Sequence, residues 1–479
     1  MKTYLLNPTI DKNDPYIREG RCMQKASSWA TIWPPITLAA LANLAREKGP
    51  VRLLDGNVED LSFQDLLAEI KSFDPDLVVI NTGFPSIDED MAVAGKIKEA
   101  FPKARLVAFG VYFTLLESES LKSYPFIDFA INGEPEDTFK ELLQALDSHQ
   151  SDFSSIAGLM YQVDGTLRCN AKRSLITNLD TLPKPARDLL KNDRYRLPHN
   201  DKTFTLINVA RGCPYPCIYC IVQPYYGNKV RKHSVAYVMD EIRECVEKYG
   251  VQEFLFWEEV FTLDKKYAME LCQAILDNGF AFRWAATTRV GLLDEELLSM
   301  MKKAGCYLLG LGIESGVQEI LDNAKKKQTL DDIRNAVAIC KKVGIKTMGH
   351  FIFGLPGETK ETAEETIKFL LTLNLDYMQS YCAVPYPKTE FGEMARQKGW
   401  IRPVPWSQYD FGGTSIVDMG EGALKPEDIT YFRERAFKKF YYRPLYLLKQ
   451  IKEFSFRQLF TMSKFTRWMR SKKKQKVAT

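Results

Sequence analysis

Short apolar runs alternate with segments of helical periodicity along the first part of the chain. The apolar runs predict five β-strands, at residues 3–6, 51–54, 77–80, 105–109 and 129–131. Helical spacing of apolar positions predicts helices at residues 36–48, 63–73 and 87–100. We therefore predict a doubly wound, Rossmann-like α/β domain over residues 1–150, with its ligand site at the carboxyl ends of the strands.

The same alternation returns in the second half of the chain. Six predicted strands lie at residues 205–210, 253–257, 282–287, 307–313, 346–353 and 377–383, with a helical stretch between each pair. Eight such units would close a (βα)8 barrel, so six predict a partial, TIM-like (βα)6 barrel over residues 204–390. Its working face is expected at the carboxyl ends of the strands.

Two further regions have a different pattern. Residues 151–203 predict a connector, with a small hairpin at residues 158–168 and a proline-bearing stretch after it. Residues 391–479 predict a helical region, in which Pro444 must kink or divide a helical run at residues 425–448. The α/β fold class therefore has two domains, a connector and a helical C-terminal part.

The chain ends in a basic tail. Residues 449–479 hold ten lysines or arginines and a single acidic residue, Glu453, interleaved with aromatic side chains. Such a segment suits peripheral contact with an anionic membrane, or equally a packed helix followed by a solvated tail. No nucleic-acid-reading module accompanies the charge, so nucleic-acid binding is not expected.

Composition narrows the class of protein. The chain has 45% hydrophobic and 26% charged residues, which excludes a disordered or collagen-like chain. It shows neither a secretory leader nor an apolar run of membrane-spanning length, and seven of its ten cysteines are scattered singly. We expect a cytoplasmic protein with reduced thiols.

The remaining three cysteines stand together in one loop after the first strand of the second domain. Cys213, Cys217 and Cys220 have C-x3-C-x2-C spacing. Three thiolates so close together suit a 4Fe-4S cluster whose fourth iron has no protein ligand. The alternatives are inert buried thiols and a structural zinc site completed by His233.

This cysteine spacing, with Tyr219 before the last cysteine, resembles the radical S-adenosylmethionine (SAM) superfamily. The resemblance extends to the subgroup with an N-terminal cobalamin-binding domain. The supporting blocks are residues 132–136, 182–187, 312–315, 354–359 and 385–389. Each block alone is weak, but their order around the cysteines is specific.

The resemblance implies a cluster on Cys213, Cys217 and Cys220, and SAM contacts at the strand ends. Tyr219 would lie near the adenine, and Glu258 or Glu259 would contact the methionine amino group. Arg289 would supply a charge-assisted contact to the carboxylate. Further contacts are expected from the residues that end the fourth and fifth strands: Glu314, Ser315, Gly354 and Gly357.

For cobalamin, the candidate contacts lie at the strand ends of the first domain: Asn57, Thr82, Ser86, Gly110 and Glu134. Residues of these types also favour ordinary turns and caps. The four histidines are at positions 149, 199, 233 and 350, so none lies within the first 148 residues. We therefore expect no histidine on cobalt from this domain, and a domain retained only as a scaffold is the alternative.

The resemblance implies a cobalamin-dependent radical SAM enzyme that methylates an unactivated carbon. A 5′-deoxyadenosyl radical would activate the substrate, methylcobalamin would supply the methyl group, and a flavodoxin or ferredoxin would supply electrons. One alternative is oxidative cyclisation or rearrangement, as in the anaerobic magnesium-protoporphyrin ester cyclase, and another is a non-catalytic sensor or scaffold. Four aromatic side chains suggest a partly apolar small substrate: Trp257, Trp284, Tyr381 and Tyr386. No catalytic residue is assigned.

Overall fold

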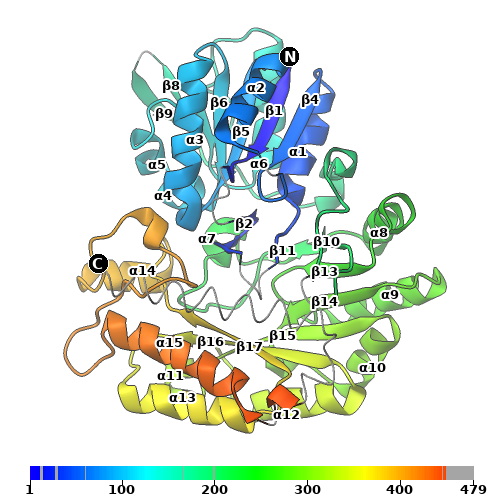
Figure 1. Cartoon of the computed structure of the whole chain (residues 1–479), viewed down its shortest axis with the longest axis vertical. Coiled ribbons are helices and arrows are strands. Elements are labelled where there is room, and N and C mark those ends of the chain that lie inside the picture. Colours follow the sequence, from blue (N-terminus) through cyan, green and yellow to red (C-terminus); the bar gives the residue numbers. More distant parts are fainter. Residues whose placement is uncertain are drawn as a thin grey trace.

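The computed structural model describes residues 1–10, 15–26, 31–59, 61–163, 165–197, 200–444 and 446–448 of the chain. These residues form two α/β units, one above the other along the long axis of the molecule (Figure 1). The first part of the chain forms the upper unit, and the second half forms the lower one.

The upper unit contains a seven-stranded sheet in the order β4-β1-β5-β6-β7-β8-β9. Its parallel strands are β1 (Thr3–Asn7), β4 (Val51–Asp55), β5 (Leu77–Thr82), β6 (Arg105–Gly110) and β7 (Phe129–Ile131). Every residue of the central strand β5 is buried, because helices cover both faces of the sheet. All five predicted strands are confirmed.

Four main helices form the two outer layers of this unit. Helices α1 (Ile36–Arg46) and α6 (Pro135–Asp147) bury their apolar sides in one core with alternate strand residues such as Leu5 and Val79. Helices α2 (Phe63–Phe73) and α3 (Ile87–Ala100) pack in the other core with Leu6 and Ile80. This is the doubly wound arrangement that the sequence predicts.

Two hairpins differ from the sequence-based division. β8 (Leu159–Val163) and β9 (Thr166–Cys169) form the predicted hairpin, but they extend the first sheet by antiparallel pairing of β8 with β7. Tyr161 of β8 buries in the same core as α6, which explains this attachment. The second hairpin, β2 (Tyr16–Glu19) with β3 (Cys22–Lys25), was not predicted and lies between the two units (Figure 1).

The lower unit is the predicted open barrel. Its six strands are all parallel, in the order β10-β13-β14-β15-β16-β17. They are β10 (Phe204–Asn208), β13 (Glu253–Trp257), β14 (Arg283–Thr288), β15 (Cys306–Glu314), β16 (Lys346–Phe353) and β17 (Tyr377–Cys382). The helices outside them are α8 (Val235–Tyr249), α9 (Lys265–Asp277), α10 (Glu295–Lys303), α12 (Leu330–Val343) and α13 (Lys360–Thr372).

The C-terminal region covers the open edge of this barrel. Helix α14 (Glu390–Gln397) is followed by α15 (Pro426–Tyr441), which packs along β17 (Figure 1). α15 ends at Tyr441, so the helical run is divided before Pro444, as predicted. The basic tail at residues 449–479 lies outside the described residues. Among the described helices, none combines the length and the apolar character that crossing a bilayer requires.

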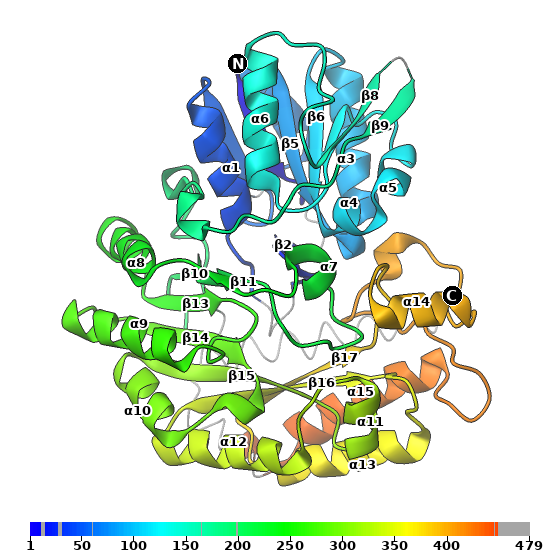
Figure 2. The ribbon, with the colours of Figure 1, turned by 180° about the vertical axis from the view of Figure 1, so that it is seen from behind.

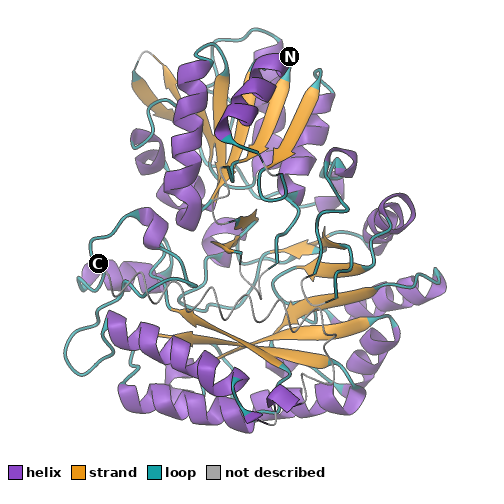
Figure 3. Ribbon diagram, in the orientation of Figure 1, coloured by secondary structure: helices purple, strands orange, loops and turns teal. Residues whose placement is uncertain are grey.

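The carboxyl ends of the parallel strands in the upper sheet point toward the lower unit (Figure 3). The β2–β3 hairpin and the short helix α7 (Val222–Tyr226) lie between the two units, as the view from behind also shows (Figure 2). Helix α7 contacts helix α4 (Val111–Leu116) of the upper unit. Residues of both domains therefore face one interdomain space.

Candidate active site

Two short, paired strands flank the segment that contains the cysteine loop. β11 (Ala210–Arg211) precedes the loop and pairs antiparallel with β12 (Arg231–Lys232), so that Arg211 lies opposite Arg231. Gly212 has a φ of +94°, and a Cβ there would lie 2.2 Å from the backbone oxygen of Lys229. Only glycine fits this turn into the loop. The three cysteines and α7 are thus presented between the two units.

The three thiols lie close enough to influence one another. Burial raises the pKa of the Cys220 thiol to about 12, and the Cys217 thiol adds to the rise. Burial and Cys217 also raise the pKa of Cys213. The guanidinium Nη1 of Arg289 donates to Cys217 Sγ over 3.7 Å. The three half-buried cysteines share one short loop, and this donor set fits an iron–sulfur cluster, which binds them as thiolates.

The zinc alternative has no support from His233. Its Nδ1 lies 3.2 Å from Asp180 Oδ1, and its ring stacks on Tyr237 with the ring centres 4.0 Å apart. Burial lowers its pKa to about 4. Over the described part of the chain, no three His, Cys, Asp or Glu side chains are arranged around a single ion. Thiolates that bind different irons of one cluster do not need such an arrangement.

A buried ion cluster joins the cysteine loop to the upper unit. Arg211 Nη2 lies 2.6 Å from Glu136 Oε1, and Arg211 Nη1 lies 3.1 Å from Glu134 Oε1. Arg231 Nη1 lies 2.8 Å from Glu134 Oε2. Burial opposes ionisation of Glu134, but the two arginines outweigh it and lower its pKa. Glu134, expected at the cobalamin site, therefore has its carboxylate engaged by the two strands that flank the cysteines.

Two adjacent carboxylates follow strand β13. Burial and the neighbouring Glu259 raise the pKa of Glu258 to about 8. Burial raises the pKa of Glu259 as well, and its ion pair with Arg21 of the β2–β3 hairpin partly offsets the rise. Both glutamates are therefore buried at the strand end where the sequence predicted a contact with the SAM amino group.

A second buried pair lies beside Tyr219. Lys326 Nζ lies 2.5 Å from Glu314 Oε1 and donates to Tyr219 Oη over 3.4 Å. Glu314 ends strand β15 with a φ of +67°, which is unusual for a residue with a side chain. A Cβ on Gly312 would lie 2.7 Å from Lys326 Nζ, so the glycine makes room for the lysine. Tyr219 and Glu314 are thus brought together by a lysine that sequence reasoning missed.

Arg289 lies against the cysteine loop, and its contact with the SAM carboxylate stays a prediction. Its Nη2 donates to the backbone oxygen of Lys326 and, over 3.2 Å, to that of Lys327. Its guanidinium lies 3.8 Å from the centre of the Tyr215 ring. Together with the contact to Cys217, these partners hold Arg289 against the cysteine loop.

Three other predicted SAM residues have packing roles. Ser315 Oγ lies 3.0 Å from Thr366 Oγ1 and accepts from the Val317 amide over 3.2 Å. A Cβ on Gly354 would lie 2.7 Å from Ile429 Cδ1, and one on Gly357 would lie 2.6 Å from Asn323 Nδ2. Both glycines have positive φ, so close packing and turn geometry explain them. Their contact with adenine stays a prediction.

The four aromatic candidates for the substrate pocket separate into two groups. Trp284 is fully buried, stacks on Phe256 and donates to the Ala304 oxygen over 2.8 Å. It belongs to the core, so its assignment to the pocket is wrong. Tyr386 packs on Phe84 of the upper unit and donates to the Tyr409 oxygen. Tyr381 and Trp257 remain near the interdomain space, since Trp257 lies under Arg21 and Tyr381 contacts His350.

Three predicted cobalamin contacts have their polar groups paired within the protein. Thr82 and Ser86 both donate to Asp90 Oδ2 over 2.6 Å, and Asn57 Oδ1 accepts from Thr9 Oγ1 over 2.7 Å. The fourth, Gly110, has a φ of +123°, and a Cβ there would lie 2.0 Å from the Thr82 oxygen. Close packing of β5 and β6 thus requires Gly110.

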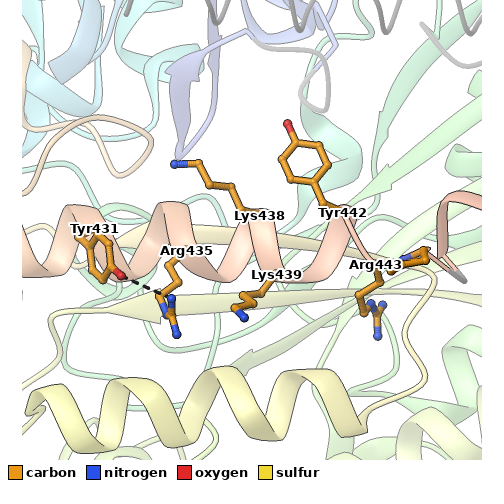
Figure 4. A pocket seen from close by; sticks show the side chains of 7 residues that line it. Tyr431, Arg435, Lys438, Lys439, Tyr442 and Arg443 are labelled. Atoms are coloured by element: carbon orange, nitrogen blue, oxygen red, sulfur yellow. Dashed lines mark hydrogen bonds between the residues drawn. The ribbon is translucent and has the colours of Figure 1, made fainter.

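A surface cleft lies elsewhere, on α15. Its volume is about 430 Å³, and none of its lining residues is a predicted cofactor contact. The lining residues are Tyr431, Arg435, Lys438, Lys439, Tyr442, Arg443 and Pro444 (Figure 4). Basic and aromatic side chains therefore line this cleft.

Comparison with known proteins identifies the two domains. Residues 207–370 match the radical SAM superfamily, and residues 26–143 match the B12 binding domain. The uncharacterized methyltransferase PH0819 of Pyrococcus horikoshii is 35% identical over 88% of this chain and 91% of its own length. The chain belongs to the radical SAM enzymes that carry a B12-binding domain. The cofactors of this family are the 4Fe-4S cluster, SAM and cobalamin, as the sequence predicted.

Other relatives of this radical SAM chain support the same architecture. The anaerobic magnesium-protoporphyrin IX monomethyl ester cyclase of Rubrivivax gelatinosus is 29% identical over 79% of this chain and 69% of its own length. The structure of the radical SAM methyltransferase TsrM from Kitasatospora setae, with tryptophan substrate and a SAM analogue bound, has a TM-score of 0.65. It is 21% identical and covers 84% of this chain and 77% of its own, so it confirms the fold.

The expectation that this domain provides no imidazole for cobalt stays a prediction. His149, the one described histidine of the upper unit, directly follows the C-terminal cap of α6, at the opposite edge of the sheet. At the carboxyl edge, a Cβ on Gly133 would meet nothing within 4 Å, so there is open space beyond β7.

Sequence reasoning missed the charged residues that position the site. These residues are Arg18, Arg21, Glu136, Arg211, Arg231 and Lys326. Arg211 stands two positions before the first cysteine, and its burial next to Glu136 follows only from tertiary contacts. The one sequence signal for such a charged cluster was the pair of acidic residues Glu134 and Glu136, which follow a turn at residues 132–133.

Proposed function

We propose that this radical SAM enzyme methylates an unactivated carbon of a small, partly apolar substrate. The relative PH0819 is named a methyltransferase, and 91% of its length aligns with this chain. The observation that carries the proposal is the buried ion cluster between domains. It fixes the cysteine loop against the B12-binding domain through Arg211 and Arg231, so that both domains serve one site.

In this proposal, Cys213, Cys217 and Cys220 hold the cluster. Tyr219, Glu314, Lys326 and the carboxylates after β13 surround SAM, as their burial and grouping support. When bound, the three cofactors supply the radical and the methyl group. The chain's own part is to position the reactants and exclude water.

The barrel interior gives the substrate side of the proposed site. A Cβ on Gly310 would lie 2.9 Å from His350 Nε2 and 3.1 Å from Thr287 Cγ2, so the glycine lets the His350 and Thr287 side chains pack closely there. His350 Nδ1 lies 3.0 Å from Tyr381 Oη. Burial lowers the pKa of His350 to about 4, which keeps the imidazole neutral at physiological pH. This lining suits a substrate with an apolar body and a hydrogen-bonding group.

The products of SAM test the proposal. The anaerobically reconstituted enzyme, given reductant, SAM and cobalamin, is expected to form both 5′-deoxyadenosine and S-adenosylhomocysteine. Cys217→Ala is expected to abolish 5′-deoxyadenosine formation, and Cys272→Ala, at a buried cysteine outside the loop, is expected to retain it. 5′-Deoxyadenosine without S-adenosylhomocysteine would favour oxidative cyclisation, and neither product would favour a sensor or scaffold.

The expected partners and location stay predictions. An electron donor such as flavodoxin or ferredoxin follows from the need to reduce the cluster. The exposed cations of α15 and the basic composition of residues 449–479 support peripheral contact with an anionic membrane surface. We propose a cytoplasmic enzyme with these two contacts.

A further inference from the structure

The β2–β3 hairpin brings one end of the first domain into the cysteine site. Its turn at Gly20 and Arg21 lies between α7 and the end of β13. Gly20 has a φ of +53°, and a Cβ there would lie 2.5 Å from Tyr226 Oη and 3.5 Å from Trp257 Nε1. The views from both sides show β2 between the two units (Figures 1 and 2). The turn therefore fits closely into the second domain.

The base of the hairpin is fixed to the first domain by Arg18. Its guanidinium Nη2 lies 2.7 Å from Asp90 Oδ1, and both side chains are fully buried. Arg18 also donates to Asn7 Oδ1 over 2.8 Å and to Ser86 Oγ over 3.1 Å. A buried, fully bonded arginine of this kind holds one geometry. The position of Arg21, three residues further on, is thus set by the first domain.

Arg21 itself serves the second domain. It forms an ion pair with Glu259, and its guanidinium lies 4.8 Å from the centre of the Trp257 ring. The neighbouring Gly20 packs against Tyr226 of α7, the short helix that directly follows the cysteine loop. A guanidinium has five N–H donors in a planar fork, so pairing with one carboxylate leaves a further edge for a second anion.

Arg289 is already committed to other partners. Its two Nη atoms are bonded to the oxygens of Lys326 and Lys327 and to the sulfur of Cys217. The contact of Arg289 with the SAM carboxylate stays a prediction, and a second guanidinium near the cysteine loop would add a donor to it. Arg21 pairs with the buried carboxylate of Glu259, and the turn that carries it packs on α7, directly after the cysteine loop.

We propose that Arg21 and Glu259 together recognise the amino-acid end of SAM. This end is a zwitterion, so a carboxylate beside a guanidinium is complementary to it. Glu259 accepts hydrogen bonds from the ammonium group, and Arg21 donates to the carboxylate. The inference rests on the proposed function and adds that a residue outside the radical SAM domain completes its cofactor site.

Isothermal titration of the anaerobically reconstituted holoenzyme tests this pair. The probes are SAM and 5′-methylthioadenosine, which keeps the adenosine but lacks the amino-acid end. Arg21→Met is expected to weaken SAM binding about ten- to a hundredfold and to change 5′-methylthioadenosine binding less than twofold. Arg21→Lys, which keeps the charge, is expected to recover part of the lost affinity. Arg46→Met is the control, since Arg46 pairs with Asp188 on the surface of the same domain.

The outcomes separate the inference from the proposed function. If Arg21→Met binds SAM within twofold of the wild type, or loses both probes equally, the inference is wrong. Iron and cobalamin contents of each variant show whether the site is still assembled, and Arg21→Lys gives a second, milder variant. If the wild-type holoenzyme binds no SAM, the proposed function itself fails.

Discussion

Several charged residues at the domain boundary are buried and form ion pairs with one another. Glu134 and Glu136 begin helix α6, but their carboxylates pair with Arg211 and Arg231 across the domain boundary. All four side chains are at most 7% exposed. Removing one partner of such a group leaves a buried charge without compensation, which costs far more than losing a surface ion pair.

Arg211→Met is therefore expected to lower the free energy of unfolding by about 3–5 kcal/mol. The measurement is urea unfolding under anaerobic conditions. Arg52→Met is the control, because Arg52 pairs with Glu69 at 3.7 Å on the surface of the upper unit. We expect the control to change stability by at most about 1 kcal/mol. Equal effects of the two substitutions would contradict the interdomain role of Arg211.

Glu358 gives stability a specific pH dependence. Burial raises its pKa from the usual 4.5 to about 8, although the Gly354 amide donates to it. Between these values the unfolded chain releases a proton that the folded chain keeps, so stability falls as pH rises from about 5 to 8. Glu358→Gln removes this dependence, and its stability relative to the wild type is expected to rise by roughly 2–4 kcal/mol over that range. Parallel unfolding curves at pH 5.5 and pH 8 would contradict the assignment.

For individual residues, the sequence predicted the cluster-binding cysteines better than it predicted which groups the polar residues contact. The three cysteines are recognisable because loop thiols at this spacing have few other uses. Ser315 and Gly354 lie in predicted motifs. In the structure, Ser315 hydrogen-bonds to Thr366, and Ile429 packs closely against Gly354; both partners are distant in sequence. Which group a polar residue contacts depends on tertiary packing, and a single sequence does not contain that information.

Among the elements, long periodic segments were predictable and short charged ones were not. The helix at residues 63–73 has the predicted bounds, because Ser62 and Asp65 form a capping box at its start. The β2–β3 hairpin has two strands of four residues with mixed polarity, so no alternation marks it. It forms because Arg18 and Arg21 find buried carboxylates in different domains.

Helix α15 acts as a cover for the edge strand β17. The Tyr441 hydroxyl accepts from the Met378 amide over 3.0 Å and donates to the Met378 oxygen over 2.8 Å. Tyr441→Phe leaves these buried backbone groups unpaired and is expected to cost about 1–3 kcal/mol of stability. Faster amide hydrogen exchange at Met378 is the measurement. Tyr442→Phe on the same helix, at a half-exposed position, is expected to change neither quantity.

The basic C-terminal segment is expected to serve membrane contact and not catalysis. Ending the chain after Gln450 should leave 5′-deoxyadenosine formation largely intact and reduce sedimentation with anionic vesicles at low salt. Each basic residue near such a surface contributes about 1 kcal/mol. Lys438→Glu/Lys439→Glu tests the cleft on α15 in the full chain and should reduce sedimentation as well. Unchanged sedimentation of both variants would exclude this role.

Across the whole molecule, two familiar domain types are joined by buried polar contacts. The sequence predicted both domains, their order and their family, because alternating strands and helices and the cysteine motif are local features. It did not predict how the domains are fixed together. That depends on Arg18, Arg21, Arg211 and Arg231, whose partners lie up to 238 positions away in the chain.

The central claim is that cluster and cobalamin face one space between the domains. Electron paramagnetic resonance of the anaerobic holoenzyme, loaded with cob(II)alamin, tests it directly. When the 4Fe-4S cluster is reduced, the cob(II)alamin signal is expected to broaden or split through magnetic interaction with the nearby cluster. An unchanged cob(II)alamin signal beside a full-intensity signal of the reduced cluster would place the cofactors far apart and contradict the account.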